Sequence, residues 1–143
     1  MMTNYPGIQR IAYIMADKLP KNLMQQSIAG LVVAVAQQSK QIKFYGLPML
    51  ETDLQEENFG WWEEATLTLQ TLEKLPTHKK LAFIIQDVNG NFFLLGTKEN
   101  HPVFNISDSV GDMEDRNVYR YKITLKCKKA LLRIAHVWLN DDL

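Results

Sequence analysis

The segment "YRYKITLKC" at 119–127 constrains the fold more than any other stretch, because its side chains alternate strictly between two chemical classes. The odd positions are apolar or aromatic and the even positions are polar, as in Tyr119, Tyr121, Ile123, Leu125 and Cys127 against Arg120, Lys122, Thr124 and Lys126. Successive side chains of a strand point to opposite faces of its sheet. The pattern therefore predicts a β-strand with one buried face and one basic, solvated face.

Two further segments read as strands. "ATLTLQTL" places Ala65, Leu67 and Leu69 on one side and threonine or glutamine on the other, which predicts a strand over 61–72. "QRIAYIMAD" at 9–17 predicts an opening strand.

A tight turn separates the β-prone runs "KLAFIIQ" and "NFFLLGT". The pair Asn89-Gly90 readily adopts the positive φ angles of a hairpin turn, so the two runs should pair with each other. Leu81–Gln86 and Phe92–Leu95 are apolar at consecutive positions. We expect both faces of this hairpin to be covered, by a helix, a second sheet or another subunit.

The segment 22–38 is compatible with either a helix or a strand. Asn22 can cap a helix, whereas the β-branched residues within Leu31–Val35 favour a strand and Gly30 weakens a helix. The segment 130–139 is similarly open, as a strand end or a terminal helix.

Prolines interrupt two other segments. "QIKFYGLPML" at 41–50 predicts a strand that breaks at Gly46 and Pro48, because proline cannot donate to a sheet ladder. "LEKLPTHKK" at 72–80 predicts a short helical turn interrupted by Pro76.

These elements indicate the α+β class, with a mainly antiparallel β-sandwich or barrel-like sheet and one or two helices, in a single domain over 1–143. The start "MMTNYPGIQR" lacks the basic and apolar regions of a signal peptide. The longest apolar run, 28–36, is shorter than the roughly 20 residues of a membrane-spanning helix. We expect a soluble, non-exported protein.

The sequence offers no catalytic motif and no cofactor signature. His78, His101 and His136 have unrelated spacings, which argues against zinc. The pairs Glu56-Glu57 and Glu63-Glu64 cannot converge as an acid and a base if they lie on strands, because neighbouring side chains diverge. We expect a protein that is not an enzyme.

Cys127 is the only cysteine, so the chain forms no intramolecular disulfide. Nearby lysines could lower the pKa of this thiol and make it reactive, but a buried structural thiol is the favoured interpretation. The acidic segment "NISDSVGDMEDRN" at 105–117 lacks the ligand spacing of a calcium loop and reads as a solvated loop.

Trp61-Trp62 and the basic strand face are candidate contact surfaces. In a strand the two indoles point to opposite faces, so one can be buried and the other can anchor a sugar or a protein, although burial of both is the favoured interpretation. The basic side chains could follow phosphates. The formal net charge of zero and the absence of an aromatic residue on that face of 119–127 argue against nucleic acid.

In the C-terminal third to half of the chain, a strand ending in Leu94-Leu95-Gly96 is followed by a loop with Pro102, a Ser/Gly/Asp stretch, Asp115-Arg116-Asn117 and a long alternating strand. This order of segments resembles structural proteins of bacteriophage or prophage tails. It implies a tail-tube-like or tail-associated β-sandwich or barrel whose subunits assemble into rings, with the loop 96–117 as an inter-subunit contact.

We therefore hypothesise a non-enzymatic assembly protein, located in the bacterial cytoplasm during assembly and then in the virion tail. Its partners would be copies of itself or other tail proteins. The alternative is a small β-barrel or sandwich that binds a ligand or a protein. The candidate interface residues are Trp61, Trp62, Gly96, Pro102, Asp112, Asp115, Arg116, Arg120 and Lys122.

Overall fold

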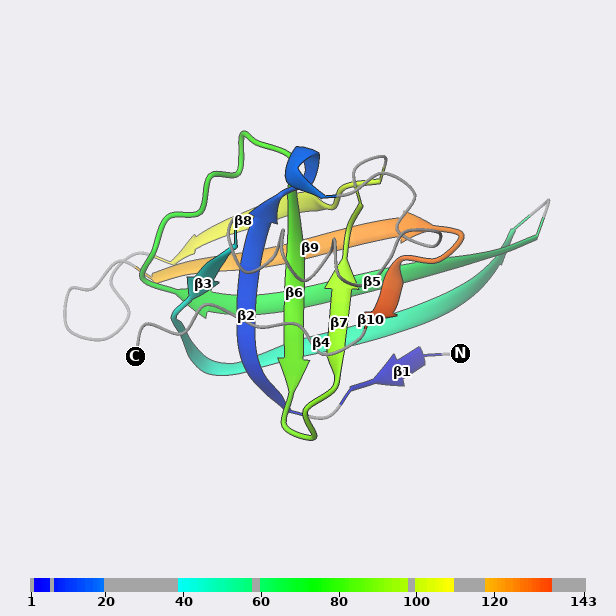
Figure 1. The fold of residues 1–143 in the computed structure, drawn as a ribbon, viewed down its shortest axis with the longest axis horizontal. Helices are drawn as coiled ribbons and strands as arrows, with labels where there is room; N and C mark the ends of the chain where they lie inside the picture. Colours follow the sequence, from blue (N-terminus) through cyan, green and yellow to red (C-terminus); the bar gives the residue numbers. More distant parts are fainter. Residues whose placement is uncertain are drawn as a thin grey trace.

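The computed structural model describes residues 2–5, 7–19, 39–57, 60–97, 100–109 and 118–134. These residues form two five-stranded sheets, in the orders β1-β4-β5-β9-β8 and β10-β7-β6-β2-β3. All of the described strand pairs are antiparallel. The strands of the first sheet run across those of the second (Figure 1).

The first sheet contains β1 (Met2–Asn4), β4 (Phe44–Glu57), β5 (Gly60–Thr71), β8 (Val103–Ser109) and β9 (Val118–Cys127). The second contains β2 (Ile8–Met15), β3 (Lys40–Ile42), β6 (Leu81–Asp87), β7 (Phe92–Leu95) and β10 (Leu131–Ile134). A single 3-10 turn, Ala16–Lys18, is the only helical element among the residues described. The mainly antiparallel sandwich is as predicted.

The main core lies between the two sheets. Leu67 on β5 and Ile123 on β9 face Phe83 on β6, and each of these side chains is fully buried. Burial of one such side chain stabilises a fold by about 1.5–3 kcal/mol. The odd positions of β9 enter this core and the basic even positions stay outside, so the prediction from alternation is confirmed.

The β6–β7 hairpin is covered on both faces, as predicted. Phe83, Ile85 and Leu95 pack against the first sheet, while Ile84 and Leu94 belong to a second buried cluster on the opposite face. The Asp87 carboxylate closes the turn by accepting bonds from the backbone N–H groups of Asn89 and Asn91, at 2.9 Å each.

The predicted break at Gly46 and Pro48 is confirmed in the pairing with β5, which skips 46–48, although β4 itself continues through both residues. A register shift between Tyr45 and Met49 accommodates them, with Gly46 at a φ of 69°. β1 pairs only with Glu51–Asp53, so Pro48 lies where β4 forms an edge and no donor is needed.

Other segments need correction. Val103–Ser109 forms β8, so the first part of the predicted acidic loop is a strand. No helical turn occurs within 72–80; the Tyr121 hydroxyl instead accepts a bond from the Leu75 N–H at 2.9 Å. The first part of 130–139 is the strand β10, while the alternative helix at 22–38 lies outside the described residues.

Candidate functional site

The first sheet has an outer face, on the side away from the core, that carries three of the predicted contact residues, Trp62, Arg120 and Lys122. It is formed by alternate residues of three central strands: Met49, Glu51, Asp53 and Gln55 on β4; Trp62, Glu64, Thr66, Thr68 and Gln70 on β5; and Arg120, Lys122, Thr124 and Lys126 on β9. The register places side chains in rows across these strands. One such row is Asp53, Glu64 and Lys126.

Charge on this outer face is distributed by strand. β9 contributes the exposed cations Arg120 and Lys122, as the alternation predicted, and β4 contributes the carboxylates Glu51 and Asp53. The face is therefore mixed in sign, with its basic side along β9. Such a surface suits a partner that also carries both signs better than it suits a uniformly anionic polymer.

Trp62 belongs to the basic side of this face. The Nζ atom of Lys128 lies 4.7 Å from the centre of the Trp62 ring, a cation–π contact between β5 and the residue that follows β9. The argument that no aromatic residue shares the basic face is thus wrong for the sheet as a whole. The local pattern of 119–127 could not reveal it, because the indole comes from β5, which is remote in sequence and is brought alongside β9 only by strand pairing.

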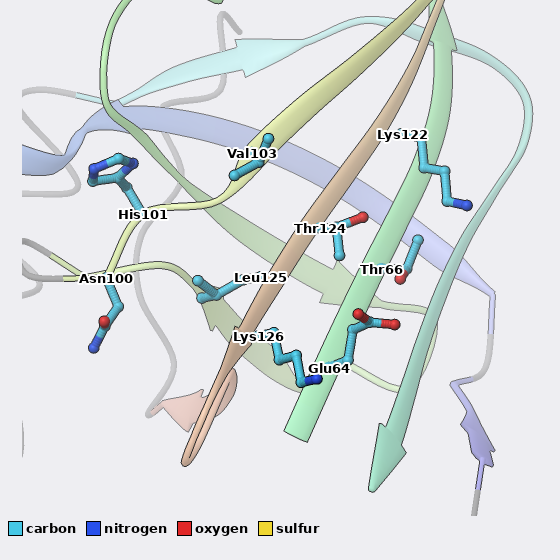
Figure 2. A pocket seen from close by; sticks show the side chains of 9 residues that line it. All are labelled: Glu64, Thr66, Asn100, His101, Val103, Lys122, Thr124, Leu125 and Lys126. Carbon is cyan, nitrogen blue, oxygen red and sulfur yellow. The ribbon is translucent and has the colours of Figure 1, made fainter. Parts of the chain in front are cut away.

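An open depression of about 630 Å³ lies on the outer face next to β9. Figure 2 shows its lining: Glu64 and Thr66 from β5; Lys122, Thr124, Leu125 and Lys126 from β9; and Asn100, His101 and Val103 from the segment that leads into β8. His101 and Glu64 lie on opposite sides of it (Figure 2). The depression combines two cations and one carboxylate with the exposed apolar side chain of Val103. It can bind a group that is part apolar and part anionic.

Gly96 and Pro102, two of the predicted interface residues, pack against each other beside this lining. Gly96 has a φ of 105°, and a Cβ atom there would lie 2.8 Å from Cδ of Pro102. Both residues are buried. The Thr97 N–H donates to the Asn100 carbonyl at 2.6 Å, which holds the next turn beside the depression.

A second feature is the arm, which we define as the end of the β4–β5 hairpin over Leu54–Glu56 and Gly60–Trp62. It extends beyond the second sheet at the right of Figure 1. Trp61 is 54% exposed and Leu54 is 44% exposed, and both lie on the face of the sheet that continues from the core. Trp61 and Trp62 diverge as predicted, but the interpretation that both are covered is wrong.

Glu63 joins the arm to the body. Its Oε1 atom accepts a bond from the Leu131 N–H at 2.8 Å, and its Oε2 atom lies 3.8 Å from Nζ of Lys129. Glu64 points to the outer face, so these two carboxylates do not converge. The inward-facing Glu63 has a structural role.

Cys127 lies opposite Glu63 on β9 and is half-buried. Burial raises the pKa of the Cys127 thiol, a backbone hydrogen bond from Lys129 opposes this, and the nearby Glu63 charge raises the pKa further. The neighbouring lysines do not reverse the effect. This environment supports the structural interpretation over the reactive one.

Three predicted residues, Asp112, Asp115 and Arg116, lie outside the described residues. Within the described ranges, no group of three or more His, Cys, Asp or Glu side chains is arranged to hold a metal ion. The described part of the chain also contains no helix of the length and apolarity that a membrane crossing requires. No family model, curated protein or solved structure matches the chain.

Proposed function

We propose that this chain is a non-enzymatic structural protein of a phage or prophage tail, which assembles into oligomeric rings or makes tail contacts. The observation that carries the proposal is the arm with its exposed Trp61 and Leu54. Large apolar side chains on a projecting hairpin are exposed to water in the monomer, and tryptophan is among the residue types most enriched at the anchors of protein interfaces.

The proposal specifies the partners and the location. The partners are other copies of the chain or other tail proteins, and the mixed charge of the outer face argues against nucleic acid. No cofactor is required. The protein assembles in the bacterial cytoplasm and is part of the virion tail, and a helix within 22–38 would complete an α+β fold.

The test is the assembly state of the purified chain over a wide concentration range. We expect light scattering to rise with concentration and negative-stain electron microscopy to show rings or short tubes. A chain that stays monomeric at every concentration would contradict assembly into rings and leave only contacts with other tail proteins. The genes that flank the coding sequence give an independent check, because capsid or baseplate genes would support a tail protein and metabolic genes would oppose it.

The alternative is a β-sandwich module that binds a ligand or a protein, and the depression favours it. Its volume of about 630 Å³ lies within the usual range of about 300–1,000 Å³ for ligand sites. Because Trp62 adjoins the same face, binding should change tryptophan fluorescence in the wild type and much less in a Trp62→Phe variant. A binding module would also remain monomeric, which separates it from the first proposal.

A further inference from the structure

The arm and the depression are complementary surfaces on the same molecule. The arm presents Trp61 and Leu54 together with the exposed carboxylate of Glu56. The depression presents the apolar side chain of Val103, which is 65% exposed, together with Lys122 and Lys126. An apolar group bearing one negative charge thus corresponds to an apolar hollow in which two cations outnumber the single carboxylate of Glu64.

One chain cannot bring these two surfaces together. The Trp61 side chain lies on the same face of β5 as Ala65 and Leu67, whose side chains point into the core. The depression opens on the outer face, where Glu64 and Thr66 point. Because the arm and the depression lie on opposite faces of one sheet, a contact between them requires two molecules.

We infer that the arm of one copy docks in the depression of the next copy, with Trp61 against Val103 and Glu56 beside Lys122 and Lys126. This inference rests on the proposed assembly function and names the contact that produces it. The occupant of the depression is a second copy of this chain. A small-molecule occupant is the competing outcome of the test.

The symmetry of the assembly follows from the contact. The two surfaces are different patches, so the contact is heterologous, and each copy carries one of each. A heterologous contact closes into a ring if the rotation between copies allows closure, and otherwise continues as a filament.

The test uses two variants that each disable one surface. Trp61→Ala removes the anchor and keeps the depression. Thr124→Trp fills the middle of the depression and keeps the arm, and tryptophan suits a half-buried strand position. Sedimentation velocity should show that each variant alone needs a protein concentration at least about tenfold higher than wild type to assemble.

The decisive measurement is a mixture of the two variants. The intact arm of Thr124→Trp can enter the intact depression of Trp61→Ala, but the remaining arm and depression of that pair are both disabled. The mixture should therefore form one-to-one heterodimers and stop there. Native mass spectrometry distinguishes the heterodimer from either homodimer by mass.

Matched controls make the same kinds of change elsewhere on the sheet. Tyr45→Ala removes a half-exposed aromatic residue from β4, and Gln70→Trp adds an indole to the outer face away from the depression. Both should assemble as the wild type does. Circular dichroism checks folding of every variant. If Thr124→Trp is misfolded, Lys122→Glu at an exposed position of the same wall replaces it.

The outcomes separate the inference from the proposed function. If the wild type assembles and the two variants assemble equally well, the inference is wrong and the proposed function stands. Loss of assembly in both variants without heterodimers in the mixture also overturns the pairing of these surfaces. A monomeric wild type overturns self-assembly into rings, and the inference with it. Saturable binding of a small molecule to the depression would then support the alternative.

Discussion

At the scale of single residues, Glu63 and Glu64 are adjacent in sequence and have different roles. Glu63→Ala should lower the free energy of unfolding by about 1–3 kcal/mol, because the Leu131 N–H loses its acceptor. Glu63→Gln should cost less, since an amide oxygen can accept the same bond and the pair with the exposed Lys129 contributes at most about 1 kcal/mol. Urea denaturation measures both effects.

The control for this prediction is the neighbouring carboxylate. Glu64→Ala should change the free energy of unfolding by no more than about 0.5 kcal/mol, because Glu64 lies on the solvated outer face. Equal losses at 63 and 64 would show that the Leu131 bond does not matter to stability.

Cys127 makes a pH-dependent prediction. Its pKa is raised in the folded chain, so the folded state keeps the thiol proton at a pH where the unfolded chain releases it. The contribution of the protonated thiol to the free energy of unfolding is fully present below the pKa of the unfolded thiol. It is lost as the pH rises through the pKa of the folded thiol. Cys127→Ala should reduce the fall in the free energy of unfolding between the unfolded and the folded pKa, as measured by urea denaturation from neutral pH upward. Iodoacetamide should also label native Cys127 more slowly than the unfolded chain.

At the scale of elements, two glycines with positive φ angles occupy different surroundings. Gly90, at a φ of 85° in the β6–β7 turn, has nothing within 4 Å of the position that a Cβ atom would occupy, so Gly90→Ala should cost only the backbone strain of about 1–2 kcal/mol. Gly96→Ala adds a clash with Pro102 and the backbone of Ala82, and should cost about 1–3 kcal/mol more. Thermal unfolding of the two variants tests the difference. Equal losses would mean that the packing against Pro102 is unimportant.

The elements that could be predicted from sequence are those whose local pattern agrees with their environment. β9 alternates in sequence and also alternates between core and solvent, so its pattern was sufficient. The Asn-Gly turn likewise carries its own backbone preference. β8 was missed because Asn105, Ser107 and Asp108 are typical of loops, and its extended shape comes from pairing with β9.

The candidate site was predictable only in part, for a related reason. The cations of β9 and the divergence of Trp61 and Trp62 follow from strand parity alone. The depression depends instead on which strands pair and in which register, and this pairing joins residues that are far apart in sequence. Local periodicity carries no information about partner or register, so the contribution of Glu64, Thr66 and His101 could not be foreseen.

At the scale of the whole molecule, the sandwich and the arm should be separable. The core residues Leu67, Ile123 and Phe83 all lie in the body, whereas the arm extends past the second sheet. Leu54 and Glu63 are direct partners in the β4–β5 register. Residues 55–62 can therefore be replaced by an Asn-Gly turn that joins this pair without changing the register.

We expect this shortened chain to fold and to remain monomeric. Its melting temperature should stay within a few degrees of the wild-type monomer, because Glu63 keeps its bond to Leu131 and none of the removed side chains that the structure describes is fully buried. Assembly measured by sedimentation velocity should be lost, because the hairpin that carries Trp61 is gone. A shortened chain that still forms rings would assign assembly to another surface, and one that cannot fold would make the arm part of the folding unit rather than a contact element.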